Sequence, residues 1–401
     1  MHEIKPARLR IAMAIYRLHP RGGLEDNCLR VVEILRSRGH DVTVFTAVNG
    51  EAPGIKRICL PQAATRRSNH KRMHTFARDA RQAVGSGGFD RSVAFQMMPG
   101  FDVLFLADNI RNKSAAPFWQ RFSPRFRTFA SLEKEVFSPG SKTKVIGLSG
   151  AQMEPFETVY GPQTGRIVIA PPTISPAKHK PESRTGESRA ALRGALDINA
   201  NSMVFLAMCL MPEVKGLDRT IEALGNLPDA HVLVAGISGN DKKARAIVAQ
   251  AKRLGVENRV HWLGYLSGEQ LFSAMAASDV LAHPARTEVT GAVILEAVIN
   301  GLPVVATSLC GFAHHIEKAQ AGHVIGEPFS QKRYQETLLM AAGQSLELSA
   351  NGIRYGMAAE LFDGLQAVAD WIETGPVHEG GNGANAFSKN IRAEASQDKG
   401  R

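Results

Sequence analysis

The stretch TEVTGAVILEA at residues 287–297 decides the fold of this chain. An apolar run, Val-Leu-Ala at 280–282, precedes it, and the turn sequence Asn-Gly-Leu-Pro follows at 300–303. An apolar strand, a polar loop that reaches a glycine, and an apolar helix are the repeating units of an open parallel sheet. We therefore expect a strand, a loop and a helix N-terminus in that order, within an α/β domain.

Two glutamates flank this loop, and their positions indicate a ligand site. Glu288 is predicted in the loop at the carboxyl end of the strand, where open parallel sheets bind ligands. Gly291, Ala292 and Val293 would offer unpaired amide N–H groups at the helix start, which suit an anionic oxygen. Glu296 falls about two turns later, on a face that returns towards the ligand. The alternative is an ordinary α/β loop with two solvated acids.

Length and composition limit the class of protein. A chain of 401 residues can hold two domains with separate cores, and 44% hydrophobic with 21% charged residues is a globular composition. The four cysteines, at 28, 59, 209 and 310, form no CxxC pair, which favours buried thiols in a reducing compartment. The first ten residues are polar and basic, unlike a signal peptide, and no apolar run reaches the ~20 residues of a spanning helix. These features predict a cytoplasmic protein.

The net charge of +10 is unevenly distributed. Residues 1–170 hold 26 lysines and arginines against 14 aspartates and glutamates, a net charge of +12, and the remainder carries −2. A basic half indicates an acidic partner, such as anionic lipid, a phosphorylated acceptor or nucleic acid. A charge that serves only solubility is the competing interpretation.

The first half opens with a βαβ pattern: an apolar run at 9–15, a helical pattern, and an alternating strand at 40–47. Gly22 and Gly23 lie in its first turn, where glycine lets backbone approach a ligand closely, although a turn that needs glycine only for its geometry is equally consistent. The turn lacks GxGxxG and no acid ends the second strand, which argues against a nicotinamide-dependent dehydrogenase.

The second half alternates strand-like runs with helical stretches, which predicts a parallel sheet wrapped by helices. The runs cover 204–210, 231–237, 260–263, 279–283, 303–308 and 323–326. The stretch 171–197, rich in Pro, Lys, Ser and Arg, is predicted as the interdomain linker and the entry to the second domain. The polar, glycine-rich residues 375–401 are predicted as a disordered tail.

Together these segments resemble the family 4 glycosyltransferases of the GT-B fold, over most of residues 8–374. The likeness is carried by RGGLEDNCLRV at 21–31, SNH at 68–70, MPGFDVLFLAD at 98–108, PRFRTFASLEKEVF at 124–137, IAPP at 169–172, KGLDRTIEAL at 215–224, TEVTGAVILEA at 287–297, CGFAHHI at 310–316 and EPFSQ at 327–331. The resemblance implies two Rossmann-like, doubly wound parallel-sheet domains that face each other across a cleft. Residues 1–170 would bind the acceptor, 171–356 the nucleotide sugar, and 357–374 would form a helix that crosses back.

The resemblance also implies an activity. The chain most resembles enzymes that add the first glucose to a heptose of the lipopolysaccharide inner core, which implies a retaining hexosyltransferase using UDP-glucose and a lipid-linked acceptor. The alternatives are the same fold with another nucleotide sugar and a glycolipid or capsule acceptor, or a non-catalytic sugar-nucleotide-binding protein. A nucleic-acid-binding protein is supported by charge alone, since stacking platforms and a reading helix are missing.

Carried onto this chain, the resemblance assigns Glu288 to hydroxyls of the donor sugar and Glu296 to the ribose. The backbone of Thr290, Gly291, Ala292 and Val293 would contact sugar or phosphate, Lys215 the diphosphate, and Gly22 with Gly23 would close over the donor. Two positions depart from the family. Val214 stands where a second basic residue usually precedes Lys215, so Lys215 acts alone or Arg219 or another cation substitutes. Asn27 replaces an aspartate of the relatives.

The expected chemistry fits these residue types. A departing diphosphate needs positive charge and oriented amides. The chain has no DxD motif, so we expect no metal and no other cofactor, with Lys215 and the helix dipole in their place. Glu288 is interpreted as a binder of the sugar, because in a same-face attack the diphosphate oxygen itself takes the acceptor proton. Asp108 and His70, from loops of the first domain, are candidates to orient the acceptor; a purely structural polar role is equally open.

The segment RNKSAAPFWQRFSPRFR at 111–127 predicts a membrane contact. Its cations and aromatic residues are Arg111, Lys113, Phe118, Trp119, Arg121, Phe122, Arg125, Phe126 and Arg127. Ser123 and Pro124 are a typical N-cap and first turn for a helix to Phe137, with Phe126, Phe129 and Val136 as its core stripe. Aromatic residues before this cap, flanked by cations, suit an interfacial anchor. We expect peripheral association with the cytoplasmic surface of the inner membrane.

Overall fold

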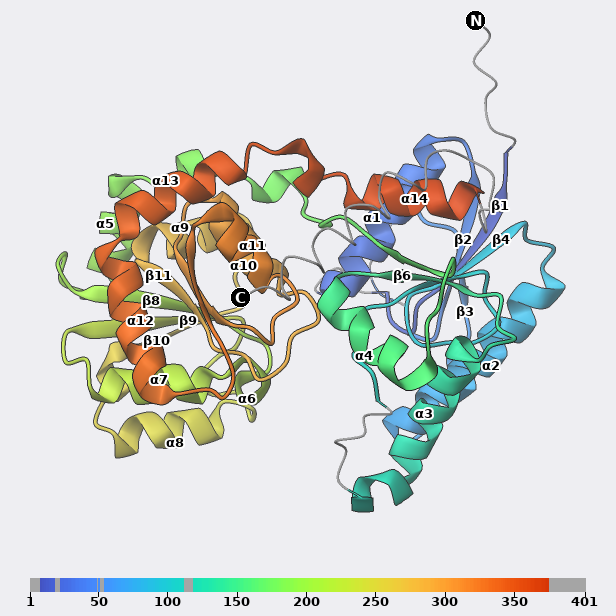
Figure 1. The fold of residues 1–401 in the computed structure, drawn as a ribbon, viewed down its shortest axis with the longest axis horizontal. Helices are drawn as coiled ribbons and strands as arrows, with labels where there is room; N and C mark the ends of the chain where they lie inside the picture. Colours follow the sequence, from blue (N-terminus) through green and yellow to red (C-terminus); the bar gives the residue numbers. More distant parts are fainter. Residues whose placement is uncertain (1–7, 19–21, 49, 51–53, 112–117, 375–401) are drawn as a thin grey trace, which may run out of the picture.

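The computed structural model describes residues 8–18, 22–48, 50, 54–111 and 118–374. The predicted tail at 375–401 lies outside this part of the chain. Two α/β domains lie side by side, joined by two crossings of the chain (Figure 1). Both sheets are entirely parallel, which confirms the predicted fold class of two Rossmann-like, doubly wound domains.

The N-terminal domain has a seven-stranded sheet in the order β3-β2-β1-β4-β5-β6-β7. Its strands are β1 (Arg10–Ala14), β2 (Asp41–Thr46), β3 (Arg57–Cys59), β4 (Arg91–Ala94), β5 (Val103–Phe105), β6 (Lys144–Gly147) and β7 (Ile167–Ile169). Its helices are α1 (Gly23–Ser37), α2 (Asn69–Ser86), α3 (Pro124–Phe137) and α4 (Gly150–Tyr160), with short 3-10 turns η1 (Pro61–Ala63) and η2 (Phe118–Phe122). Alternate residues of β1 enter different cores: Ile11 and Met13 pack with α1, whereas Ala12 and Ala14 pack with α2, α3 and α4.

The C-terminal domain has a six-stranded sheet in the order β10-β9-β8-β11-β12-β13. Its strands are β8 (Met203–Met208), β9 (Ala230–Ala235), β10 (Val260–Gly264), β11 (Val280–His283), β12 (Val304–Thr307) and β13 (Gly322–Ile325). Its helices are α5 (Gly186–Ala195), α6 (Pro212–Lys215), α7 (Leu217–Gly225), α8 (Arg245–Arg253), α9 (Glu269–Ala277), α10 (Ala292–Ile299), α11 (Ala313–Ala319), α12 (Gln331–Gly343) and α13 (Ser345–Tyr355), with 3-10 turns η3 (Pro176–Lys178), η4 (Pro181–Ser183) and η5 (Glu257–Arg259).

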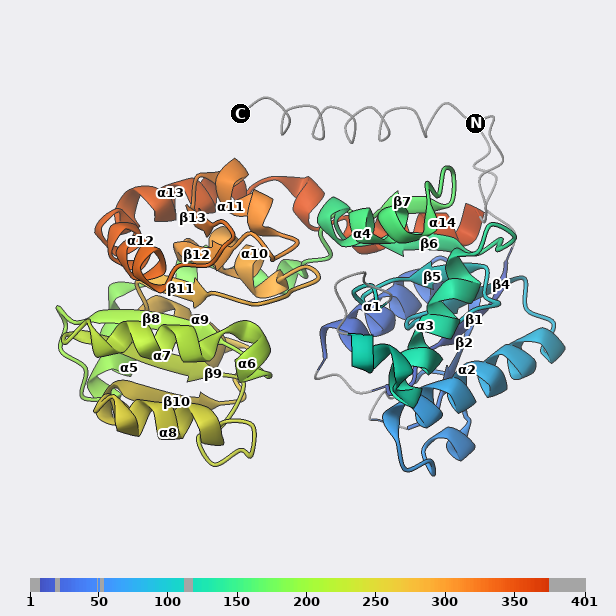
Figure 2. The same ribbon diagram turned by 60° about the horizontal axis from the view of Figure 1, so that its bottom comes forward.

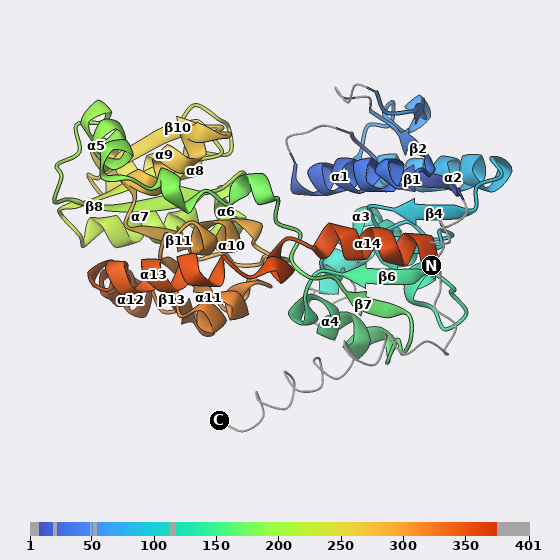
Figure 3. The same cartoon turned by 90° about the horizontal axis from the view of Figure 1, so that it is seen from above.

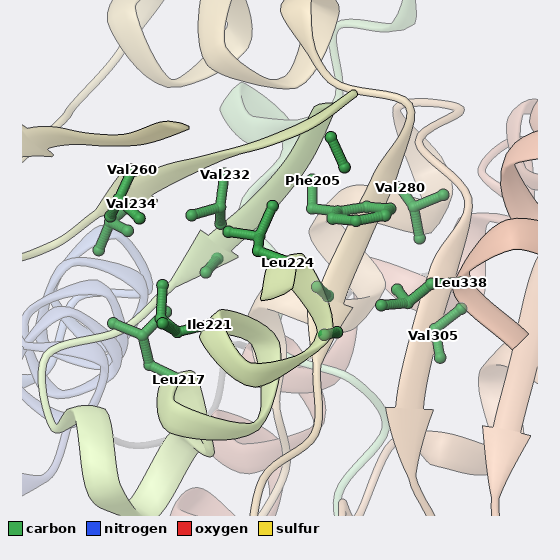
Figure 4. Packing of buried hydrophobic residues seen from close by; sticks show 14 of the residues in the cluster. Phe205, Leu217, Ile221, Leu224, Val232, Val234, Val260, Val280, Val305 and Leu338 are labelled. Carbon is green, nitrogen blue, oxygen red and sulfur yellow. The ribbon is translucent and has the colours of Figure 1, made fainter. Parts of the chain in front are cut away.

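Apolar residues at helical spacing bind the helices of this domain to its sheet. Leu217, Ile221 and Leu224 form one stripe of α7 that packs on the strands, where Figure 4 shows it below Phe205 and Val232. Helices α7, α8 and α12 cover this face, and α9, α10 and α11 cover the other. Strands β9 and β10 are added on one side of β8, and β11, β12 and β13 on the other, so the carboxyl ends of β8 and β11 form the topological switch point where doubly wound sheets bind ligands.

The last helix, α14 (Gly364–Thr374), returns to the N-terminal domain after the turn η6 (Ala359–Leu361). Its apolar face joins the core beneath α1, and Figure 3 shows α14 lying near α1. Arg38, at the end of α1, is ion-paired with Asp370 at 2.7 Å and with Glu373 at 3.0 Å. A Cβ at Gly364 would collide with the carbonyl oxygens of Pro171 and Pro172, so the two crossings between the domains touch at this point.

The stretch 171–197, predicted as the interdomain linker and the entry to the second domain, contains a helix in its later part. Residues 186–195 form α5, which is part of the C-terminal domain. The polar composition misleads here because Arg193 is buried, donating to the carbonyl oxygen of Ala277 at 2.9 Å and pairing with Asp279 at 2.9 Å. Across the described ranges, no helix combines the length and hydropathy needed to cross a membrane.

Candidate functional site

The loops that leave β8 and β11 carry Lys215 and Glu288 to the switch point of the C-terminal domain. Lys215 ends α6, and Gly216 follows with a φ of +70°. A Cβ at Gly216 would collide with the carbonyl oxygen of Pro284, so this turn lies against the end of β11. Lys215 Nζ is ion-paired with Glu288 Oε2. The structure thus joins two of the predicted site residues directly.

The groups around this ion pair are neutral. His283 is buried with its Nε2 3.5 Å from Glu288 Oε2. Burial, together with the Lys215 charge, lowers the pKa of His283 to about 3, so its imidazole is neutral. Burial also raises the pKa of the Cys209 thiol to about 12 and raises that of Cys310. Burial lowers the pKa of Lys215.

The loop that contains Glu288 is held as an extension of the sheet. Glu288 forms a parallel bridge with Cys310 in the loop after β12, and the Phe312 amide donates to the Thr290 carbonyl oxygen at 2.7 Å. Gly291 then caps α10 with a φ of +79°, a backbone conformation that favours glycine. The first amides of α10, at Ala292 and Val293, have no helical partner and face the same end as Glu288.

Glu296 lies farther along α10 and is only 4% exposed. Its Oε1 is 2.6 Å from Nζ of Lys178, at the end of η3 in the linker. Burial raises the pKa of Glu296, Lys178 lowers it, and Asp26 in the first turn of α1 raises it. The first turn of α1, in the other domain, therefore lies within electrostatic reach of α10.

The glycine pair lies at the start of α1. Gly22 is the N-cap in an extended conformation with a φ of −119°, and Gly23 begins the helix. A Cβ at Gly22 would collide with the carboxylate of Glu25, whereas Gly23 has open space around it. Asn27, which replaces the aspartate of the family pattern, is one residue beyond Asp26 in the same helix.

Asp108 follows β5 and is brought close to the Glu288 loop. The side chain of its neighbour Asn109 donates to Thr287 Oγ1 at 3.1 Å, and Ser149 Oγ, at the N-cap of α4, is 3.4 Å from the Val289 carbonyl oxygen. Both contacts cross between the domains, one on each side of Glu288; Figure 2 shows the loops beside α10 reaching towards α4. Burial raises the pKa of Asp108, partly offset by Arg111 and by the Met97 amide.

His70 is placed differently from the prediction. It lies in the first turn of α2 rather than in a loop, because Ser68 in extended conformation precedes the helix. Its Nε2 is 3.5 Å from Ser68 Oγ. Within the described residues, no recorded contact joins it to Lys215 or Glu288.

Arg219, the candidate second cation, is engaged elsewhere. Its Nη1 donates to the Pro284 carbonyl oxygen at 3.0 Å, and its guanidinium lies 3.7 Å from the ring centroid of Phe329. The nearby Arg286 forms a two-bond ion pair with Asp218. Neither guanidinium contacts Glu288 in the described part of the chain, where no group of three or more His, Cys, Asp and Glu side chains forms a metal-ion cluster either.

The predicted membrane segment is only partly described. Lys113 lies outside the described residues. The Ser123 cap is confirmed, since its hydroxyl accepts from the Phe126 amide at 3.1 Å and Pro124 starts α3. Before this cap, Trp119 is 74% and Phe122 65% exposed at the end of α3, which projects from the N-terminal domain (Figure 1).

The start of that segment is built into the fold. The Arg111 amide donates to the buried carboxylate of Glu133 at 2.7 Å, and its guanidinium lies 5.4 Å from the ring centroid of Phe129. Of the predicted core stripe, Val136 is buried, whereas Phe126 and Phe129 are half-buried. Arg121, Arg125 and Arg127 are exposed.

Three residues of this region escaped the sequence analysis: His283, Lys178 and Ser149. His283 ends β11, one position before the proline that closes the strand, and a polar residue at the end of an apolar strand is a detectable signal. Lys178 is 118 residues from Glu296 and Ser149 is 140 residues from Val289. No local pattern links partners at that separation.

Sequence comparisons relate this chain to known proteins over most of its length. Residues 188–355 match the family model described as glycosyl transferases group 1. The chain is 35% identical over 376 residues to lipopolysaccharide glucosyltransferase WaaG of Escherichia coli K12, which covers 91% of this chain and 99% of that protein. It is 24% identical over 322 residues to a D-inositol 3-phosphate glycosyltransferase of Xylanimonas cellulosilytica, covering 72% of this chain and 76% of that one.

Solved structures give the same picture of the fold. The crystal structure of WaaG, a glycosyltransferase involved in lipopolysaccharide biosynthesis, superimposes with a TM-score of 0.82 and 32% identity, covering 90% of this chain and 99% of that one. Anabaena HepE in complex with UDP-glucose superimposes with a TM-score of 0.68 at 19% identity, covering 92% and 99%. The latter likeness is one of fold alone.

Proposed function

Because this chain belongs to the family of group 1 glycosyl transferases, we propose that it transfers glucose from UDP-glucose to a heptose of a lipopolysaccharide inner core. It is a retaining hexosyltransferase of family 4. The observation that carries the site is the Lys215–Glu288 ion pair beside the first amides of α10, at the switch point of the C-terminal sheet. The likeness to WaaG, a lipopolysaccharide glucosyltransferase, across nearly the whole of both chains supports glucose as the transferred sugar and lipopolysaccharide as the acceptor.

The donor would separate the ion pair on binding. Its diphosphate takes the Lys215 ammonium and the free amides of Ala292 and Val293, which face the same end of α10. The sugar hydroxyls take the carboxylate of Glu288, and His283 beneath it stays neutral and adds no competing charge. Glu296 would accept from the ribose, with Gly22 and Gly23 across from it at the start of α1.

The transfer needs no enzymic nucleophile in this proposal. The acceptor hydroxyl oxygen bonds to the anomeric carbon on the face that the diphosphate leaves, and the bond from that carbon to the diphosphate oxygen breaks. The acceptor proton passes to that departing oxygen, so UDP leaves and the configuration is retained. Negative charge grows on the diphosphate, where Lys215 and the positive end of the α10 dipole stabilise it without a metal.

In this proposal Lys215 is the single cation that contacts the diphosphate, which is consistent with Val214 standing where the family usually has a second basic residue. Arg219 is held by Pro284 and Phe329, so we assign it to support of the Lys215 turn rather than to the diphosphate. Asp108 is the better placed of the two acceptor candidates, because Asn109 binds its loop to Thr287, next to Glu288. His70 is assigned at most to a more distant part of the acceptor.

A lipid-linked acceptor places the reaction at a membrane surface. We assign the docking surface to η2 and the first turn of α3, where Trp119 and Phe122 are exposed beside Arg121, Arg125 and Arg127. Aromatic residues with cations around them suit the interface of an anionic leaflet. The excess charge of residues 1–170 has the matching sign.

The function is tested by transfer of radiolabelled glucose from UDP-glucose to heptose-terminated lipopolysaccharide. We expect labelled product with retained anomeric configuration by NMR, and no product from acceptor that lacks heptose. Parallel reactions with UDP-galactose, GDP-mannose and ADP-glucose test the donor. Faster transfer from any of these, or from UDP-glucose to heptose-free acceptor, would contradict the assignment.

A further inference from the structure

Glu296 has a buried carboxylate, and the cation that contacts it comes from the interdomain linker. Lys178 is half-exposed in the linker, yet its Nζ lies 2.6 Å from Oε1 of Glu296. Within the described residues, the other oxygen, Oε2, forms no hydrogen bond. One carboxylate oxygen is therefore occupied and the other is left for a ligand.

The position of Lys178 is fixed by a buried asparagine at the end of α10. The Asn300 side-chain amide donates to the backbone carbonyl oxygens of Lys178 and of Glu296, both at 2.7 Å. Its Oδ1 accepts from the Lys180 amide, also at 2.7 Å. Asn300 is 2% exposed, so these bonds form away from water. The linker is thus attached to the same helix that carries Glu296, and these hydrogen bonds hold Lys178 next to the carboxylate.

The charges around Glu296 oppose its ionisation except for Lys178. Burial raises the pKa of Glu296, and Asp26 in α1 raises it further, whereas Lys178 lowers it. Arg30, also in α1, donates to the linker carbonyl oxygens of Thr173 and Ile174 at 2.8 and 3.3 Å. An ionised carboxylate accepts hydrogen bonds on both oxygens, but a protonated one donates from one of them.

We propose that Lys178 is a positioning residue for the nucleotide: it holds Oε1 of Glu296 and keeps this carboxylate ionised, so that Oε2 accepts a ribose hydroxyl. This inference rests on the proposed role of Glu296 in donor binding. A charge-assisted hydrogen bond from a hydroxyl to a carboxylate is stronger than a neutral one. By keeping Glu296 ionised, Lys178 strengthens the hydrogen bond from the ribose. Because Lys178 belongs to the linker, ribose binding is also coupled to the segment that Arg30 attaches to the N-terminal domain.

The test compares Lys178→Met and Lys178→Arg with a matched control, Lys180→Met. Lys180 is in the same linker, but its ammonium pairs at 3.0 Å with the exposed Glu269. Affinity is measured by calorimetry for UDP-glucose and for its 2′-deoxyribose analogue, at pH 6.5, 7.5 and 8.5. The thermal unfolding temperature of each free variant checks the fold.

We expect Lys178→Met to weaken UDP-glucose binding about tenfold at pH 6.5, because the buried Glu296 takes up a proton more readily once its cation is lost. The loss of affinity becomes smaller as the pH rises towards 8.5, because a higher pH favours the ionised carboxylate. The variant discriminates less between ribose and deoxyribose donors at pH 6.5 than the native protein does. Lys178→Arg and Lys180→Met stay within about twofold of native.

Two outcomes overturn the inference. One is native affinity of Lys178→Met at all three pH values while Glu296→Gln binds weakly; the donor site then stands and Lys178 has no part in it. The other is an equal loss at every pH and for both donors, which means a structural role only. If Glu296→Gln itself binds UDP-glucose normally, the proposed donor site has failed as well.

Discussion

The ammonium of Lys215 and the carboxylate of Glu288 form an ion pair, although 73 residues separate them in the chain. The pair exists because two adjacent parallel strands, β8 and β11, end at the same edge of the sheet. Each partner neutralises the other where the surrounding thiols and His283 carry no charge. Replacing one partner leaves the other charge partly buried and unpaired, so single substitutions here have large effects.

Replacing Glu288 or Glu296 with Ala should weaken transfer at least tenfold. A hydrogen bond to a charged group contributes about 1.5–3 kcal/mol, which corresponds to roughly ten- to hundredfold in kcat/KM. Steady-state kinetics with UDP-glucose measures the effect. Glu269→Ala is the control, because this carboxylate is 76% exposed in the same domain. Native kinetics in both variants would refute the donor-site assignment.

Lys215→Ala should lower kcat more than it weakens donor binding, because the diphosphate gains charge as the bond breaks. Single-turnover kinetics and UDP-glucose titration separate the two effects. EDTA should leave the native rate unchanged, since Lys215 and α10 supply the positive charge. Strict dependence on a divalent ion, restored by adding it back, would show that this account of the leaving group is wrong.

The alkaline limit of kcat/KM should lie below pH 10.5, the ordinary pKa of lysine. Burial lowers the pKa of Lys215, and the active ammonium is lost as the pH rises through that lowered value. Lys215→Arg should move the limit upwards, because a guanidinium keeps its proton. A pH profile of kcat/KM from 7 to 11 tests this. An identical alkaline limb in both proteins would assign the titration to another group.

Acid should destabilise the fold through His283. Its pKa of about 3 in the folded protein lies below the ordinary 6.5, so the unfolded chain takes up a proton first as the pH falls. The contribution of neutral His283 to the free energy of unfolding is fully present above pH 6.5. It is lost as the pH falls from 6.5 to 3, at about 1.4 kcal/mol per pH unit. Urea unfolding of native protein and His283→Gln between pH 7.5 and 5 should show a shallower loss in the variant. Parallel slopes would contradict it.

Replacing Arg121, Arg125 and Arg127 with Gln should release the protein from anionic liposomes. Each cation near an anionic leaflet contributes about 1 kcal/mol, so three correspond to roughly a hundredfold in the partition coefficient. The matched control carries Lys242, Lys252 and Arg253→Gln on the C-terminal domain, with the same change in net charge. Flotation with anionic and neutral liposomes measures binding. Equal release of both triple variants would mean that the effect is net charge and not this surface.

Local patterns predicted the parts of the site that lie within one βα unit. The loop and helix of TEVTGAVILEA and the Ser123 cap follow from glycine, proline and apolar spacing over a few residues. The contacts between the two domains at the site do not follow from local sequence patterns. Asn109 contacts Thr287 across 178 residues, and only the packing of two domains decides that contact. The helix α5 was not predicted for a different reason. The sequence alone does not show that Arg193 is buried, so its segment was interpreted as polar linker.

The return of α14 makes the C-terminal domain an insertion in topological terms, since the chain on both sides of it builds the N-terminal core. Val368 and Ile372 complete that core, so the first domain to be synthesised cannot finish its packing until its last helix has left the ribosome. The C-terminal domain carries all its own strands between β8 and β13, and of the segment after α13 it takes up Leu361, which packs with Leu295 and Ile299 of α10. The N-terminal core is therefore complete only after the whole C-terminal domain has been synthesised.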